Sequence, residues 1–211
     1  MENLRETIFR TLTRPETILK IKTILPKLFQ IAESECSRAG KIGMEVGSLR
    51  EKIIISFLIN TFGNESVETF RITEPEADVK VNGIPLSIKT ITGNGGIKAV
   101  WTVDASSAQT FLKNYQPKCD IILVKIDWKT GKGGLFVIPI EVQQQLFKSM
   151  KEDYLQLPKQ GTNPRGVEFN KSAVEKMLVH KDTIKILIDW KKEKIEYDVY
   201  KRWVDYWSNK I

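Results

Sequence analysis

The 211-residue sequence contains one histidine and two cysteines. With His180 alone, the chain cannot supply a multi-histidine metal centre, and a Ser-His-Asp triad or a histidine-dependent nuclease would depend on that single imidazole. Cys36 and Cys119 form no disulfide framework, which favours a reducing compartment and predicts a cytoplasmic protein. Any bound metal is therefore expected to be held by carboxylate and carbonyl oxygens, which suit magnesium, manganese or calcium better than zinc.

Long apolar runs are also absent. The longest covers residues 53–59, is interrupted by Ser56, and is far shorter than the roughly 20 residues that cross a bilayer. The start, MENLRETIF, has acidic residues where a signal peptide needs a basic flank, so no membrane association is expected. Neither TGNGG (92–96) nor TGKGG (130–134) fits the phosphate-binding pattern G-x-x-x-x-G-K-[ST], so no nucleotide cofactor is expected.

Basic residues are in excess. Lys and Arg number 33 against 26 Asp and Glu, which gives a net charge of +7 and a pI near 9.3. Such a surface attracts polyanions and favours nucleic acid as a partner, although many basic chains bind nothing anionic. With 41% hydrophobic and 28% charged residues, the chain has the composition of an ordinary globular protein.

Helical periodicity dominates the first third of the chain. Apolar residues recur at helical spacing through the first forty residues, where Pro15 suits a first turn and Pro26 is expected to kink or divide the helix. Ser48 and Glu51 form an S-x-x-E capping pattern ahead of a second apolar stretch, and Gly63 follows it. These signals predict a helix over residues 49–62 that begins with a capping box.

A hairpin is predicted over residues 77–90. Asn82-Gly83 is a strong two-residue turn signal, and it places Val79 opposite Leu86. The same register places Asp78, Ser87 and Lys89 on one face of the sheet. Four apolar residues of the hairpin then share the other face: Val79, Val81, Leu86 and Ile88.

The remainder alternates between strand and helix patterns. We expect a helix near 105–114, a strand buried on both faces at 119–128, a strand at 134–140, a helix at 141–154 and a strand at 184–190. A terminal helix carries Tyr200, Trp203 and Trp207, which suit packing or a dimer contact better than base stacking. This order predicts an α/β fold with a mixed central β-sheet flanked by helices and preceded by an N-terminal helical segment.

Two carboxylates and a lysine are the residue types needed for metal-dependent phosphodiester hydrolysis. Asp78 and Lys89 share a face, but the acid expected two residues before the lysine in a (D/E)xK motif is Ser87. Glu51, on the preceding helix, is the candidate replacement, with Glu68 or Glu76 next. Each also has a structural interpretation: Glu51 as a cap, Asp78 as a strand opener and Lys89 as a solvated lysine.

Literal motif matching gives other candidates. Three D-x-K strings begin at Asp78, Asp127 and Asp189. The first, which ends at Lys80, is the serious alternative and would need Glu65 or Glu68 as its partner acid.

Two loops could contact DNA. Met44 lies in a glycine-flanked loop near Arg38 and Lys41 and could act as a wedge between base pairs from the minor groove, although most methionines fill cores. Arg165, in the segment GTNPRGVEF, could bind guanine O6 and N7 or be a plain surface arginine.

The order helix Glu, hairpin Asp, then Lys resembles the PD-(D/E)xK nuclease fold. The spacing of Met44, Glu51, Asp78 and Lys89 more narrowly resembles the ThaI-like restriction endonucleases that cut CGCG. This resemblance implies a homodimer that cleaves both strands of a short palindrome in double-stranded DNA, with Glu51 and Asp78 as Mg²⁺ ligands and Lys89 as the catalytic lysine.

We therefore interpret the chain as a magnesium-dependent type II restriction endonuclease of a restriction-modification system, in which the carbonyl of Ile88 assists the metal ligands. It is expected to form one domain over 1–211, with a helical segment and DNA-contacting loop at 1–47 and the catalytic core and C-terminal helices at 48–211. The alternatives are a structure-specific or repair nuclease with the same site, and a DNA-binding protein without catalysis.

Overall fold

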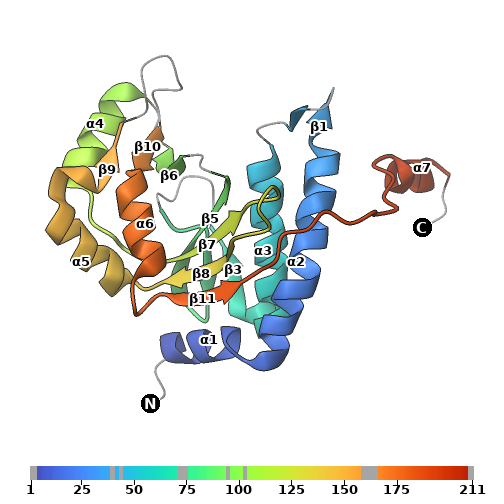
Figure 1. Ribbon diagram of the computed structural model, residues 1–211, viewed down its shortest axis with the longest axis horizontal. Helices are drawn as coiled ribbons and strands as arrows, with labels where there is room; N and C mark the ends of the chain where they lie inside the picture. Colours follow the sequence, from blue (N-terminus) through green and yellow to red (C-terminus); the bar gives the residue numbers. More distant parts are fainter. Residues whose placement is uncertain are drawn as a thin grey trace.

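A six-stranded mixed sheet forms the centre of the computed structural model, which describes residues 4–38, 41–42, 45–70, 76–93, 96–101, 104–157 and 166–208 (Figure 1). In spatial order the strands are β11 (Ile184–Leu187), β8 (Gly134–Ile138), β7 (Asp120–Ile126), β5 (Ile84–Thr92), β4 (Val79–Val81) and β3 (Val67–Thr69). β5 and β7 run parallel, and the other described neighbours run antiparallel. The predicted α/β fold with a mixed central sheet is confirmed.

The β4–β5 hairpin has the register that its turn predicts. Val79 pairs with Leu86 and Val81 with Ile84. Asn82 and Gly83 both adopt positive φ, 49° and 79°, which a two-residue type I′ turn requires at its two central positions. The turn sequence therefore sets the pairing, and the pairing sets which side chains share a face.

Two hydrophobic cores cover the two faces of the sheet. α2 (Pro15–Glu35) and α3 (Val46–Phe62) pack on the face that carries Val79, Leu86 and Ile88. The opposite face packs on α4 (Ala105–Asn114), α5 (Ile140–Met150) and α6 (Lys171–Val179). β7 contributes alternate residues to both cores, which confirms that this strand is buried on both faces.

A second sheet of three strands, which the sequence patterns did not predict, lies beside α4. Its order is β6 (Ile97–Trp101), β10 (Gly166–Phe169) and β9 (Leu155–Gln156), all antiparallel. α6 was likewise not predicted. Two further strands, β1 (Ser37–Arg38) and β2 (Lys41–Ile42), form a small antiparallel pair between α2 and α3.

The capping box predicted at the start of the second helical stretch is wrong. α3 begins at Val46 instead of residue 49, and its N-cap residue, Glu45, makes no side-chain capping hydrogen bond. The chain already has helical backbone angles at Glu45, and the Leu49 N–H donates to the Glu45 carbonyl at 3.1 Å. Ser48 and Glu51 therefore lie inside the helix and form no capping box. α2 continues through Pro26 as one helix, so of the two effects expected of Pro26, division does not occur.

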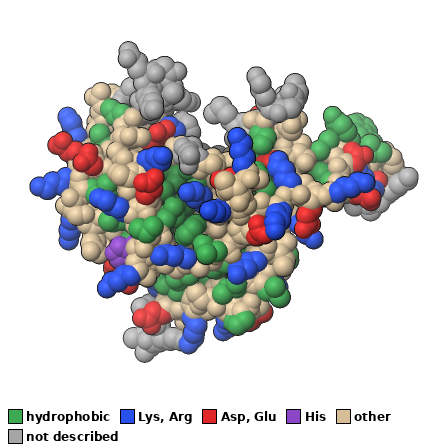
Figure 2. Space-filling model, in the orientation of Figure 1, with side chains coloured by type: hydrophobic (Ala, Val, Ile, Leu, Met, Phe, Trp, Pro, Cys, Tyr) green, Lys and Arg blue, Asp and Glu red, His purple; other side chains and the backbone are tan. Residues whose placement is uncertain are grey.

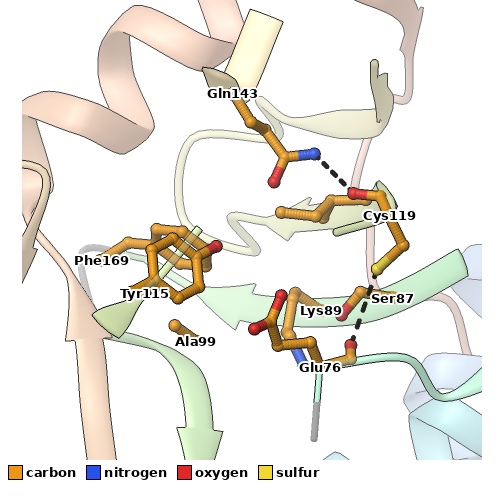
Figure 3. A pocket seen from close by; sticks show the side chains of 9 residues that line it. Glu76, Ser87, Lys89, Ala99, Tyr115, Cys119, Gln143 and Phe169 are labelled. Atoms are coloured by element: carbon orange, nitrogen blue, oxygen red, sulfur yellow. Dashed lines mark hydrogen bonds between the residues drawn. The ribbon is translucent and has the colours of Figure 1, made fainter. Parts of the chain in front are cut away.

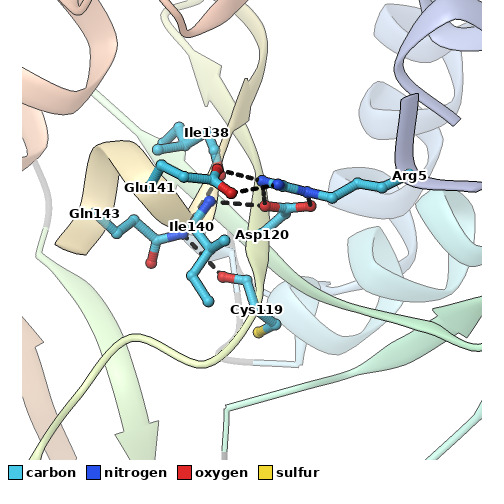
Figure 4. Close-up of polar contacts among 7 residues, drawn as sticks. All are labelled: Arg5, Cys119, Asp120, Ile138, Ile140, Glu141 and Gln143. Carbon is cyan, nitrogen blue, oxygen red and sulfur yellow. Dashed lines mark hydrogen bonds and ion pairs between the residues drawn. The ribbon is translucent and has the colours of Figure 1, made fainter. Parts of the chain in front are cut away.

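The N-terminal helix α1 (Leu4–Leu12) is held to the sheet by ion pairs (Figure 4). Arg5 donates to both carboxylate oxygens of buried Asp120, at 2.5 and 2.7 Å, and to Glu141 at the start of α5. Asp120 also accepts the Ile140 N–H at 2.7 Å. None of the helices in the described residues is long and apolar enough to span a membrane.

Candidate active site

Asp78 is the centre of a group of polar contacts at the end of the hairpin. It lies directly before β4, and its Oδ2 accepts the Ile88 N–H at 2.5 Å and the Ser87 hydroxyl at 3.2 Å. The Lys89 ammonium lies 3.5 Å from the same oxygen. The register thus brings together Asp78, Ser87 and Lys89 as the sequence predicts, and Asp78 is held in one orientation by its neighbours.

The main-chain polar groups of Ile88 point toward Asp78. Its N–H points from β5 toward Asp78, and the N–H and C=O of one strand residue point to the same side of the strand. The Ile88 side chain is buried in the core beneath α2 and α3. The carbonyl oxygen is therefore on the side of β5 where Asp78 lies.

Glu51 approaches from the neighbouring helix. α3 packs against β5, and Glu51 is half-buried on it. Burial raises the pKa of its carboxyl, the negative charge of Asp78 raises it further, and Lys89 lowers it. Two carboxylates and one ammonium thus interact at one place, supplied by a helix, a strand entry and a strand.

Glu76 is a further carboxylate in this region. It lines a cavity of about 10 Å³ together with Ser87 and Lys89 (Figure 3). The other lining residues are Ala99, Tyr115, Cys119, Ile121, Gln143 and Phe169. Burial raises the pKa of Glu76 to about 7, against the opposing effects of Lys118 and Lys89. The cavity is about the size needed for one water molecule beside the polar side chains of Glu76, Ser87 and Lys89.

The alternative motif residues point elsewhere. Lys80 lies 3.9 Å from Glu68, which is 68% exposed, and its ammonium stands over the ring of Phe70. Asp127 accepts hydrogen bonds within its own turn, from Lys129 and Thr130. Asp189 pairs with Lys191 at the surface. The lysine in contact with Asp78 is Lys89.

Of the residues predicted to contact DNA, the structure describes only the backbones of Arg38 and Lys41. Met44 and Arg165 lie outside the described residues. Arg38 and Lys41 pair through their backbones in the β1–β2 strands, and their side chains are outside the description. Their roles stay predictions.

A buried ion pair anchors the part of α3 that carries Glu51. Arg50, 4% exposed, donates to Glu33 of α2 at 2.6 Å and to the Thr92 hydroxyl at 2.9 Å. Trp128 Nε1 donates to the same Glu33 at 2.6 Å, and Lys192 lies 3.1 Å from its other oxygen. Removing one partner of such a pair leaves an uncompensated buried charge. The arrangement fixes α3 against α2 one residue from Glu51.

Comparison with known proteins decides the family. The family model described as restriction endonuclease ThaI matches residues 12–209. The chain belongs to the ThaI restriction endonuclease family. A solved structure described as a restriction endonuclease in complex with substrate DNA is 50% identical, with a TM-score of 0.86, and the match covers 98% of this chain and 100% of that one. No curated protein matches the chain.

Membership of the ThaI family confirms the predicted activity. The protein is a type II restriction endonuclease, a site-specific deoxyribonuclease. In this ThaI-family enzyme the predicted acids and lysine converge without a (D/E)xK motif, because the acid position of that motif holds Ser87. Among the described residues, no group of three or more His, Cys, Asp or Glu side chains could hold a metal ion. A metal at this site would therefore be bound by at most two of these side chains together with main-chain oxygen atoms.

Proposed function

We propose that this enzyme cuts double-stranded DNA at the palindrome CGCG, as a homodimer that uses Mg²⁺. The observation that carries the proposal is the convergence of Glu51, Asp78 and Lys89, in which the Asp78 carboxylate lies 3.5 Å from the Lys89 ammonium and its charge raises the pKa of Glu51. Family membership and the DNA complex of the similar endonuclease support the substrate class. The specific sequence comes from the resemblance of the residue spacing.

The donor atoms of this site fit a hard divalent cation. Glu51 and Asp78 would hold it, with the Ile88 carbonyl as a third oxygen donor, and such all-oxygen sets suit Mg²⁺. Burial and the negative charge of Asp78 both disfavour the ionised form of Glu51. A cation between the two carboxylates would relieve the repulsion between them. When bound, Mg²⁺ would polarise the scissile phosphate and lower the pKa of water.

The residues of the chain have separate tasks in hydrolysis. The Ile88 N–H and the Ser87 hydroxyl orient Asp78, so that its second oxygen is free of these two contacts. Lys89 supplies a positive charge that stabilises the charge developing on the phosphate or positions the attacking water. Ser87 replaces an acid by a neutral hydrogen-bond donor, which leaves Glu51 as the second negative charge.

The homodimer follows from the symmetry of the proposed target. A palindrome presents the same half-site on each strand, and a two-fold dimer places one active site at each scissile phosphate. Arg38, Lys41, Met44 and Arg165 are the residues we propose to contact the DNA. In the sequence Met44 lies two residues before Val46, where α3 begins, and Glu51 lies five residues after Val46.

Digestion of a fully sequenced plasmid tests the proposal. With Mg²⁺ we expect discrete fragments that all end within CGCG, and none with EDTA in place of the metal. Cuts only at irregular DNA structures would favour a repair nuclease, and specific binding without cleavage at any divalent metal would favour a DNA-binding protein. Fixed fragments that end in another sequence would overturn the CGCG assignment alone.

Met44→Ala is expected to weaken binding to the cognate duplex far more than binding to random DNA. A side chain driven between base pairs must offset an unstacking cost of a few kcal/mol, which only the cognate site repays through new contacts. The free energy of unfolding, measured by thermal denaturation, should stay within about 0.5 kcal/mol of the wild-type value, as for a surface substitution. Loss of about 2 to 5 kcal/mol of stability with unchanged cognate affinity would instead show a core methionine.

A further inference from the structure

The C-terminal segment forms an arm that leaves the body of the molecule. After β11 the chain runs along α2 without regular structure and ends in α7 (Lys201–Trp207), beyond α2 and on the side away from the sheet (Figure 1). We call residues 191–207 the α7 arm. Its position differs from that of the other described helices, which pack on the sheet or on each other.

Large apolar side chains of this arm are exposed to solvent. Tyr200 is 70% exposed, Trp203 52%, Val204 57%, Tyr206 62% and Trp207 90%. These five residues are the apolar face of α7, and hydrophobic side chains gather at this end of the molecule (Figure 2). A helix of seven residues gains little stability from its own hydrogen bonds and normally depends on packing. The described part of the chain leaves this face largely uncovered.

Polar contacts hold the arm in place. The Gln30 side chain and the Glu193 backbone exchange two hydrogen bonds, of 2.7 and 3.0 Å. Further along, the Tyr197 hydroxyl donates to Glu35, and Arg202 lies 3.4 Å from the same carboxylate. The arm is therefore attached to α2 through polar groups, while the apolar face of α7 stays exposed to solvent.

The charge of the arm argues against DNA as the partner of this face. Residues 191–207 contain five basic residues (Lys191, Lys192, Lys194, Lys201, Arg202) and four acidic ones (Glu193, Glu196, Asp198, Asp205), a net charge of +1. Phosphate binding depends on a clear excess of Lys and Arg. Exposed Trp, Tyr and Arg with few uncompensated charges are instead typical of the core of a protein interface.

We propose that the apolar face of α7 packs against a second copy of this chain and forms part of the dimer interface. The inference rests on the homodimer of the proposed function. Aromatic side chains bury roughly 150 to 250 Å² each, so the four on each of two arms, with the surfaces that they cover, would supply area on the order of the 1,600 Å² of a standard stable interface.

A second copy also offers an apolar surface for the arm to cover. A groove of about 270 Å³ lies between α2 and α3 and is lined chiefly by aliphatic side chains. Ile24, at this groove, is 48% exposed, and Leu19 on the same helix is 62% exposed. The same chain thus carries an uncovered aromatic face and an open apolar groove, as expected if both become buried when two copies associate.

The double variant Trp203→Ser, Trp207→Ser tests this role. Its dissociation constant for the dimer, measured by sedimentation equilibrium, should rise at least about 10-fold over wild type, because buried tryptophans are common hot spots. Leu187→Ser is the matched control, since Leu187 is 64% exposed but lies outside the arm, and it should leave the constant unchanged. Thermal unfolding at a concentration where wild type is monomeric should show that both variants fold.

The outcomes separate this inference from the proposed function. A wild-type dimer that the double variant forms equally well would overturn the role of α7 and leave the homodimer intact. Unchanged dimerisation with lost DNA affinity would assign the arm to DNA instead. A wild-type enzyme that is monomeric both free and on a cognate duplex would overturn the homodimer and, with it, the interface proposed here.

Discussion

Asp78→Asn and Lys89→Ala are each expected to lower the rate of DNA cleavage by about 10³-fold or more. In the proposed mechanism each substitution removes a charge that would act on the phosphate or hold the metal, and a loss of about 4 kcal/mol of transition-state stabilisation corresponds to that factor. Asparagine keeps an oxygen that can accept the Ile88 N–H, so the hairpin should remain folded. Single-turnover cleavage of a CGCG duplex with saturating Mg²⁺ measures the effect, and binding to the same duplex should persist.

Lys80→Ala is the matched control for Lys89→Ala. Both lysines follow Asp78 along the hairpin, but the Lys80 ammonium lies beside Glu68 and Phe70 at the surface. Its loss should therefore change the cleavage rate by less than about threefold, as for a surface substitution. A fully active Lys89→Ala enzyme together with an inactive Lys80→Ala enzyme would transfer the site to the D-x-K string.

Glu51→Gln is expected to fold normally and to lose cleavage by a similar factor. Glu51 makes no capping interaction, because α3 begins five residues before it, so the amide removes only a negative charge from the site. The raised pKa means that the ionised carboxylate is disfavoured in the metal-free folded protein. Without metal, the variant should thus be as stable as wild type or slightly more stable at neutral pH.

The pH dependence of that stability difference gives an independent check. Because the folded-state pKa of Glu51 is raised, ionisation weakens the folded state as pH rises through that pKa. At acid pH, where Glu51 is protonated in both states, wild type and Glu51→Gln should unfold at the same temperature. Unfolding followed by circular dichroism in EDTA measures this.

Glu76→Gln distinguishes the two candidate second carboxylates. Glu76 lines the small cavity beside Lys89, and its pKa of about 7 reflects burial. If Glu51 holds the metal, Glu76→Gln should retain far more cleavage than Glu51→Gln in the same assay. The reverse order would place the second carboxylate at Glu76 and remove Glu51 from the site.

Local signals predicted the elements that contain the site. The Asn82-Gly83 turn predicted the hairpin register, and the apolar pattern of 119–128 predicted the central strand, because both depend on residues close in sequence. The three-stranded sheet was missed since β6 and β10 are short and far apart in the chain, and their pairing depends on tertiary contacts. α6 did carry a local signal: Asn170 caps it, and Ala173 and Met177 form one buried stripe.

The residues of the candidate site differed in how far the sequence alone could predict them. Asp78, Ser87 and Lys89 followed from register alone, whereas Glu51 was one candidate acid among several until the family resemblance singled it out, because no local pattern brings α3 to the hairpin. Its supposed cap was wrong, since helix entry at Glu45 depends on backbone geometry that S-x-x-E does not report. The burial of Glu76 could not be read from sequence, because Tyr115, Cys119 and Gln143, which line the same cavity, come from distant segments.

The separation of Glu51 from Asp78 and Lys89, one on a helix and two on the sheet, bears on how the proposed site is completed. Val46 and Glu51 are five residues apart on one helix, about 7.5 Å along its axis, and the loop that we propose inserts into DNA ends at that helix. The Arg50–Glu33 ion pair fixes α3 one residue from Glu51, so a disturbance at the start of the helix has to strain that contact before it displaces this proposed ligand. Contacts with DNA at the start of α3 and the completeness of the proposed site would then depend on one helix, while Asp78 and Lys89 stay in place at the hairpin.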